Sequence, residues 1–183
     1  MTTFINTLTL LRIFLAAVIF LFLMTPDGYL LALILFFVAG LTDYFDGYLA
    51  RKYNSVSQLG EILDPIADKI LILFVLFGLS INLSSYLIGF IGAIIITREI
   101  WVGALRDLNA RNGKSNATKV TFLAKIKTSI QLASIFIYLL GLTINNMLLI
   151  VIGDITLFIS LLITLYTGFI YTLASFGDKK NEL

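Results

Sequence analysis

Four aspartates are the residues most able to do chemistry. Asp43 and Asp46 lie near the end of one apolar segment, and Asp64 and Asp68 lie near the start of the next. An ionised carboxylate in apolar surroundings is unfavourable unless it is paired or bound to a metal. The chain has no cysteine and no histidine, so any metal must be held by oxygen, which favours magnesium, manganese or calcium. We therefore predict a divalent-cation site.

The spacing of the acids places each pair on one side of a helix. Asp43 and Asp46 are three residues apart, and Asp64 and Asp68 are four apart, so the two members of a pair lie within about 60° around the helix axis. Two such helices joined by a short turn can bring all four carboxylates together. Four close carboxylates repel one another unless cations lie between them. The pattern indicates one or two bound ions.

Small residues and an arginine accompany the acids. Gly47 and Ala50 leave room for a flat group beside the ions. Arg51, one turn beyond Gly47, has a planar donor fork that suits phosphate. Together with the acids, these residues suggest a phosphate-ester substrate. Taken singly, Gly47 and Ala50 are also typical of helix packing, and Asp46 and Arg51 of interfacial charges.

The composition indicates that membrane helices position these acids. Of the 183 residues, 59% are hydrophobic and 13% are charged, and the mean hydropathy is +0.99, which is unlike a soluble domain. Six apolar segments are long enough to cross a bilayer: residues 8–24, 29–50, 62–81, 86–105, 120–144 and 147–176. We predict an all-α integral membrane protein with about six transmembrane helices. Residues 1–183 form one domain, with a short segment 1–7 before the spans and a tail 177–183.

Basic residues are distributed unevenly among the predicted connections. The connections 25–28, 82–85 and 145–146 hold none. The others, with the adjoining helix ends and the tail, hold Arg51, Lys52, Arg106, Arg111, Lys114, Lys119, Lys179 and Lys180. Because basic residues favour the cytoplasmic side, both termini and the acids are expected there, in the cell inner membrane. No signal-peptide cleavage and no nucleic-acid partner are expected.

The acid-rich stretch resembles a family signature. It matches D-x-x-D-G-x-x-A-R-x8-G-x3-D-x3-D of the CDP-alcohol phosphatidyltransferase family at every fixed position, with Asp43, Asp46, Gly47, Ala50, Arg51, Gly60, Asp64 and Asp68. The resemblance implies that the four aspartates bind a pair of Mg²⁺ or Mn²⁺ ions and that Asp68 is also the general base. It further implies a homodimer, and contacts to the CDP part of CDP-diacylglycerol from Gly47, Ala50, Arg51 and Ser57.

Three other segments resemble the phosphatidylglycerophosphate synthases of that family. Residues 6–12 are similar to N-x-x-T-x-x-R, which implies nucleotide contacts from Asn6 and Thr9. Residues 98–106 are similar to R-E-x-x-V-x-x-L-R, and residues 124–128 to G-K-x-K-T, with alanine in place of the glycine. These segments predict that the phosphate of an acceptor alcohol is bound by Arg98, Arg106, Lys125 and Lys127. At 1.5 Å per residue, Asp68 and Arg98 would both lie roughly 10 Å below the cytoplasmic boundary.

Two of these segments also have structural interpretations. Asn6 or Thr7 is suited to cap a helix, with Arg12 extending its side chain to the membrane interface. Arg98 can pair with Glu99, or with a carboxylate of the acid cluster, in place of a phosphate.

The resemblance implies that the chain transfers a phosphatidyl group from CDP-diacylglycerol to glycerol 3-phosphate, giving phosphatidylglycerophosphate and CMP in phospholipid biosynthesis. Within the family, inositol phosphate, serine and phosphatidylglycerol are alternative acceptors, the last giving a cardiolipin synthase. The expected cations disfavour free serine. A divalent-cation transporter is the alternative from another class. It is disfavoured because, apart from Asp154, the spans become almost wholly apolar toward the outer side.

Overall fold

Six long helices make up most of the computed structural model, which describes residues 2–53, 58–113 and 122–177. They are α1 (Thr2–Leu23), α2 (Tyr29–Tyr53), α3 (Gln58–Asn82), α4 (Tyr86–Arg111), α5 (Phe122–Thr143) and α6 (Met147–Phe176), with a short 3-10 helix η1 (Pro26–Gly28) before α2. The described ranges contain no strand. The prediction of an all-α fold is confirmed.

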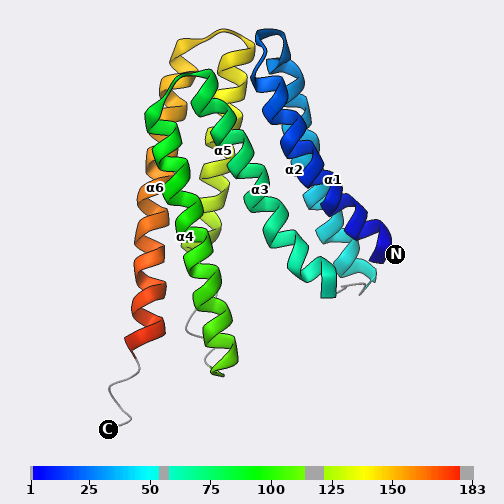
Figure 1. Ribbon diagram of the computed structural model, residues 1–183, viewed down its shortest axis with the longest axis vertical. Helices are drawn as coiled ribbons and strands as arrows, with labels where there is room; N and C mark the ends of the chain where they lie inside the picture. The colour runs from blue at the N-terminus through cyan, green and yellow to red at the C-terminus, as the bar shows by residue number, and fades with distance from the viewer. Residues whose placement is uncertain (1, 54–57, 114–121, 178–183) are drawn as a thin grey trace.

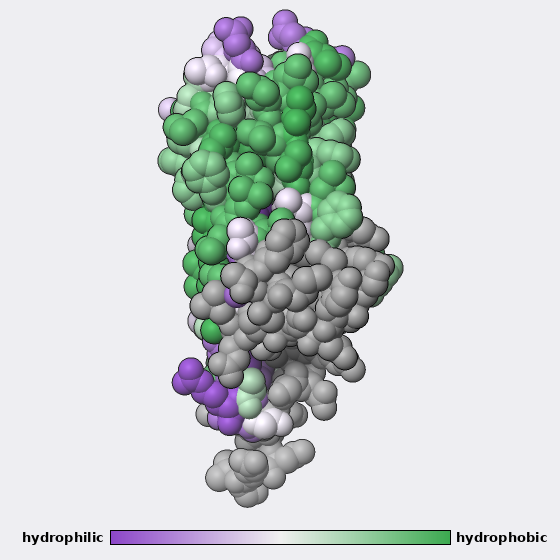
Figure 2. Space-filling model, turned by 90° about the vertical axis from the view of Figure 1, so that its right-hand side faces the viewer, coloured by the Kyte–Doolittle hydropathy of each residue, from purple (hydrophilic) through white to green (hydrophobic). Residues whose placement is uncertain are grey.

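The surface of the bundle is suited to a membrane. Among the described residues, five helices are long and apolar enough to span one, namely α1, α2, α4, α5 and α6. α3 carries Asp64, Asp68 and Lys69 in its first half and is not one of these five. Figure 2 shows a broad apolar surface over the upper part of the molecule, with polar side chains at the two ends. Such a surface matches lipid chains, and the fold indicates a multi-pass membrane protein.

The helices run alternately up and down (Figure 1). α1 packs against α2 and α3, and α6 packs against α4 and α5, while contacts between α3 and α4 and between α2 and α5 join the two groups. The largest fully buried apolar side chains form the core between them: Ile19, Leu23, Leu76, Leu79, Ile88, Ile91, Ile95, Ile135, Tyr138, Leu139 and Leu157. The packing of α1 on α3 matters most for function, because it brings the start of the chain to the predicted acids.

Several helices extend beyond the apolar segments that predicted them. α1 begins at Thr2 instead of residue 8, and α4 continues to Arg111 instead of residue 105. An apolar pattern marks only the part of a helix that crosses the lipid, whereas polar residues continue the same helix into the interface. The interpretation of Asn6 or Thr7 as a helix cap is therefore wrong, because both lie inside α1.

Side chains fix the turns at the end opposite the acids. The Oγ of Ser85 accepts a hydrogen bond from the N–H of Ile88, and the Oδ1 of Asn146 accepts one from the N–H of Leu148, which caps α4 and α6. Asn82 Nδ2 donates a hydrogen bond to the carbonyl oxygen of Leu23, which links the last residue of α3 to the end of α1. The connections without lysine or arginine are thus short turns held by local hydrogen bonds.

We expect Gly153→Ala to destabilise the bundle. An added Cβ at Gly153 would lie 2.8 Å from the ring of Tyr138. That ring is fully buried, and its hydroxyl donates to Asp154 Oδ1 at 2.6 Å, so it has little freedom to move. Overpacking of this kind costs about 1–3 kcal/mol, which a lower Tm of the purified protein in detergent would reveal.

Gly40→Ala is the matched control for this change. A Cβ added there meets no atom within 4 Å, and alanine has the higher helix propensity. Its Tm should be unchanged or slightly higher than that of the parent protein. Equal Tm values for the two variants would contradict the close packing of α6 on Tyr138.

Candidate active site

Arg12 of α1 lies between two of the predicted acids. Its Nη1 is 2.9 Å from Asp43 Oδ1 of α2 and 2.6 Å from Asp68 Oδ1 of α3. The Arg12 side chain is fully buried, whereas the two aspartate side chains are about half exposed, at 54% and 52%. The interpretation in which Arg12 extends to the membrane interface is wrong, because its guanidinium is enclosed between helices. One buried cation thus holds together carboxylates from two helices.

Thr9 lies one turn before Arg12 on the same face of α1 and contacts a third acid. Its Oγ1 donates a hydrogen bond to Asp64 Oδ1 at 2.8 Å. The threonine is fully buried, so the contact positions Asp64 relative to the rest of the site. Thr9 was predicted to contact the nucleotide, and its described partner in this structure is Asp64 of the acid cluster.

The structure describes only part of the predicted nucleotide site. Asn6 lies on α1 and is partly exposed. The backbone of α2 includes four further predicted residues, whose side chains lie outside the described part: Asp46, Gly47, Ala50 and Arg51. Ser57 lies outside the described residues, as does the side chain of Lys125 on α5. Contacts from these residues stay predictions.

The described acids are compatible with a metal ion. Asp43 and Asp68 converge on one cationic nitrogen, and Asp64 lies one turn before Asp68 on α3. Within the described ranges, no group of three or more acidic, histidine or cysteine side chains is close enough to hold a metal. The two carboxylates that meet at Arg12 nevertheless supply the oxygen ligands that Mg²⁺ and Mn²⁺ prefer. The residues present fit a divalent ion, and such an ion stays a prediction.

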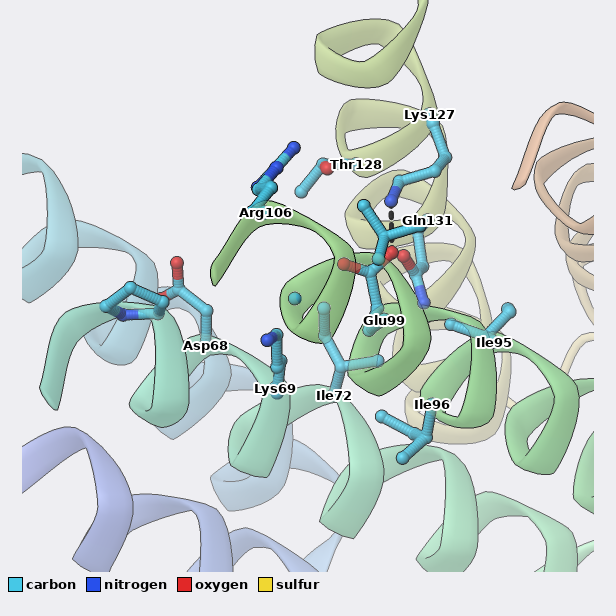
Figure 3. A pocket seen from close by; sticks show the side chains of 13 residues that line it. Asp68, Lys69, Ile72, Ile95, Ile96, Glu99, Arg106, Lys127, Thr128 and Gln131 are labelled. Carbon is cyan, nitrogen blue, oxygen red and sulfur yellow. Dashed lines mark hydrogen bonds and ion pairs between the residues drawn. The ribbon is translucent and has the colours of Figure 1, made fainter. Parts of the chain in front are cut away.

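A cavity of about 180 Å³ opens beside Asp68, between α3, α4 and α5. Its polar or charged lining residues are Asp68, Lys69, Glu99, Arg106, Lys127, Thr128 and Gln131. They belong to α3, α4 and α5 and surround a common space (Figure 3). Two of the four predicted phosphate-binding residues, Arg106 and Lys127, therefore share a cavity with the predicted general base.

A buried charge network forms the wall of this cavity. Glu99 Oε1 accepts a hydrogen bond from Lys127 Nζ and another from Arg98 Nη1, the latter at 2.8 Å. Arg98 Nη2 donates to Thr167 Oγ1 of α6 at 2.7 Å. Because each buried charge has an opposite charge or a hydroxyl beside it, the network can persist in low-dielectric surroundings. It ties α4, α5 and α6 together next to the cavity.

Arg98 and Arg106 occupy different places in the site. Arg98 is not among the lining residues of the cavity and instead lines an apolar hollow between α4 and α6, beside Trp101 and Gly168. Its pairing with Glu99, the structural alternative considered for it, is confirmed. Arg106 lines the cavity and is exposed. Both guanidinium groups lie 5.8 Å from the centre of the Tyr171 ring, at a distance suited to cation–π contact.

Three polar residues of the cavity were not among the predicted site residues: Lys69, Thr128 and Gln131. Each had a local signal. Lys69 and Thr128 directly follow predicted site residues, and Gln131 lies one helical turn after Lys127, on the same face of α5. The acids and cations that were predicted are therefore part of a larger polar lining.

The chain is similar to known proteins over most of its length. The family model of CDP-alcohol phosphatidyltransferase matches residues 2–167. Several curated relatives are named CDP-diacylglycerol–glycerol-3-phosphate 3-phosphatidyltransferase. The one from Wigglesworthia glossinidia brevipalpis is 40% identical over 127 residues, covering 69% of this chain and 68% of the relative. The one from Rickettsia bellii is 38% identical over 169 residues, covering 91% of each chain.

A third relative extends the match over almost the whole chain. The protein of the same name from Salmonella choleraesuis is 31% identical over 177 residues, covering 96% of each chain. The family match includes all four predicted acids and the whole cavity lining. The chain therefore belongs to the CDP-alcohol phosphatidyltransferase family.

Proposed function

We propose that this protein transfers the phosphatidyl group of CDP-diacylglycerol to glycerol 3-phosphate, which gives phosphatidylglycerophosphate and CMP. The observation that carries the proposal is the single cavity that joins Asp68 to Arg106 and Lys127. A carboxylate able to accept a proton and cations able to hold a phosphate are the two groups that a phosphorylated alcohol requires. The names of the relatives support the same reaction.

The reaction is a phosphoryl-type transfer. The acceptor hydroxyl oxygen attacks the phosphorus that bears the diacylglycerol, and a new P–O bond forms. The bond from that phosphorus to the bridging oxygen breaks, and CMP leaves with the electron pair. Asp68 accepts the proton of the hydroxyl, for which its half-exposed carboxylate is accessible from the cavity. Arg106 and Lys127 orient the acceptor through its phosphate.

The acids next to this cavity are proposed to hold the activating cation. Asp43, Asp46, Asp64 and Asp68 would bind one or two Mg²⁺ or Mn²⁺ ions. When bound, such ions neutralise the charge that develops on the diphosphate as CMP leaves. Gly47, Ala50, Arg51 and Ser57, together with Asn6 and Thr9 of α1, would contact the CDP-lipid. Thr9 already contacts Asp64, so it would act at the boundary between the nucleotide and the acids.

The size of the cavity favours a small acceptor. Its volume of about 180 Å³ is below the 300–1,000 Å³ that is usual for larger ligands. Phosphatidylglycerol, the acceptor of a cardiolipin synthase, carries a diacylglycerol on the phosphate of its headgroup, and a cavity of this volume leaves no room for that part of the molecule. The charged lining disfavours free serine, and family membership favours transferase chemistry over cation transport.

The direct test uses the purified protein with CDP-diacylglycerol, Mg²⁺ and one alcohol at a time, with CMP release as the readout. Glycerol 3-phosphate should give the highest rate. If it released no more CMP than water while serine, inositol phosphate or phosphatidylglycerol did, the proposed acceptor would be wrong and the family chemistry would stand. If no alcohol increased CMP release, the transferase function itself would be wrong.

Lys127→Ala should raise the KM for glycerol 3-phosphate about 10- to 100-fold and leave the KM for CDP-diacylglycerol within about twofold. The reason is that a hydrogen bond between a cation and a phosphate contributes about 1.5–3 kcal/mol, while Lys127 lines the acceptor cavity. Steady-state kinetics with each substrate varied in turn measures both constants. Arg111→Ala is the control, since Arg111 is exposed and is not among the cavity lining. An unchanged acceptor KM would exclude Lys127 from phosphate binding.

The location and assembly follow as proposals from the same function. We propose that the protein lies in the inner membrane with its acids and both termini facing the cytoplasm, where CDP-diacylglycerol and glycerol 3-phosphate meet. The uneven distribution of basic residues supports this orientation. A homodimer is also proposed from the family resemblance. Cysteine-accessibility labelling of the two ends and light scattering in detergent test these two statements.

A further inference from the structure

Gln131 of α5 is a buried polar residue for which the proposed mechanism gives no role. Only 2% of it is exposed, and its side chain lines the cavity beside Glu99 and Lys127. Its Nε2 atom is buried and has no hydrogen-bond partner within the part of the chain that the structure describes. A buried donor without an acceptor is rare in native proteins, because it has lost its water without gaining another bond. A side chain of this kind in the lining of a cavity points to a ligand atom.

The surroundings of Gln131 favour an uncharged ligand atom. Glu99 lines the same cavity, and its carboxylate can only accept hydrogen bonds, so it suits a ligand hydroxyl, which has a proton to donate. Figure 3 shows Gln131 and Glu99 on the same side of the cavity, with Asp68 on the other side. Gln131 also lies one turn further along α5 than Lys127, about 6 Å deeper into the bundle. A hydroxyl suits this position, because its oxygen accepts from Nε2 and its proton can be donated to a carboxylate.

We infer that Gln131 Nε2 donates a hydrogen bond to the hydroxyl of the acceptor that does not react, so that Gln131 selects a polyol phosphate over a simple alkyl phosphate. The inference rests on the proposed function, since it assumes that glycerol 3-phosphate occupies the cavity. In that substrate one hydroxyl attacks phosphorus, the phosphate pairs with the cations, and the secondary hydroxyl remains. A site built to bind a hydroxyl rejects an analogue without it, because its own buried donor is then left unpaired.

The test compares glycerol 3-phosphate with 3-hydroxypropyl phosphate, which lacks only the secondary hydroxyl. The parent protein should use the analogue with a kcat/KM about 10- to 100-fold lower. If glycerol 3-phosphate did not increase the release of CMP from CDP-diacylglycerol, the proposed function would be wrong. If both acceptors were used equally well, the function would stand and the inference about Gln131 would be wrong. This comparison needs no variant and does not depend on the folding of one.

Gln131→Met then assigns the selectivity to one side chain. Methionine keeps the length of the side chain and removes the donor, so kcat/KM for glycerol 3-phosphate should fall to about the value for the analogue. The effects of removing the donor and removing the hydroxyl should not add, as expected for two partners in one bond. An equal loss with both acceptors would mean that Gln131 has only a structural role.

Ser134→Ala is the matched control on α5. Ser134 is also polar and fully buried, but its hydroxyl donates to the Ile130 carbonyl oxygen of its own helix, and it is not among the cavity lining. It should keep the full preference for glycerol 3-phosphate. Loss of the preference in Ser134→Ala would show that any disturbance of α5 removes it, and would overturn the assignment to Gln131.

Discussion

Asp68→Asn is expected to lower CMP release by about 100- to 10,000-fold while CDP-diacylglycerol still binds with an affinity within a few-fold of normal. General-base catalysis contributes about 10²–10⁴-fold, and an amide cannot accept the proton of the attacking hydroxyl. The change is otherwise conservative, because the amide oxygen of asparagine can still accept the hydrogen bond that Arg12 Nη1 donates at 2.6 Å. The rate loss should therefore appear in kcat.

Single-turnover CMP release and equilibrium binding of the CDP-lipid separate these two effects. Asp107→Asn is the control, since it makes the same chemical change at an exposed residue of α4 that is not among the cavity lining. It should retain normal turnover. Near-normal turnover of Asp68→Asn would remove Asp68 from the role of base. A loss of lipid binding as large as the loss of rate would instead assign it to substrate or ion binding.

The grouping of Asp43, Asp64 and Asp68 at one end of the bundle was predictable because its signal is local. The spacing of Asp64 and Asp68 fixes a common helix face wherever the helix is placed, and two carboxylates beside an apolar segment are unfavourable in any fold unless something pairs with them. The helices were predictable for a similar reason, since apolar segments of about 20 residues can do little else in a membrane. The ends of the helices were not predictable, because the apolar pattern stops at the membrane surface while polar residues continue the same helix beyond it.

The partner of Arg12 was not predictable from the sequence. It depends on the packing of α1 against α3, and Arg12 and Asp68 are 56 positions apart in the chain. Local pattern placed Arg12 at the border of an apolar segment, where extension to the interface is the usual outcome. The cavity lining was likewise beyond local reasoning, since Gln131 becomes notable only when its Nε2 is seen buried without a partner. Short-range spacing identified the chemistry, and long-range packing decided which residues share a site.

The second large effect is expected from Arg12→Met, which removes the one described cation that joins Asp43 to Asp68. Methionine keeps an unbranched apolar chain in place of the arginine stem, so the main loss is the charge and its hydrogen bonds. Breaking a fully buried ion pair costs about 3–5 kcal/mol, but both carboxylates here are half exposed and water can solvate them in part. We therefore expect a smaller loss of about 1–3 kcal/mol, measured as a lower Tm in the presence of a chelator.

Added Mg²⁺ or Mn²⁺ should stabilise Arg12→Met more than it stabilises the parent protein. Without the guanidinium, the carboxylates repel each other, and an ion that binds the folded state supplies the missing positive charge. Arg111→Met makes the same substitution at an exposed position at the end of α4, and it should match the parent both with chelator and with metal. If Arg12→Met had the parent Tm in chelator, the Arg12 pairing would not support the fold. If metal raised the Tm of Arg12→Met and of the parent by the same amount, then Asp43 and Asp68 would not be where the ion binds.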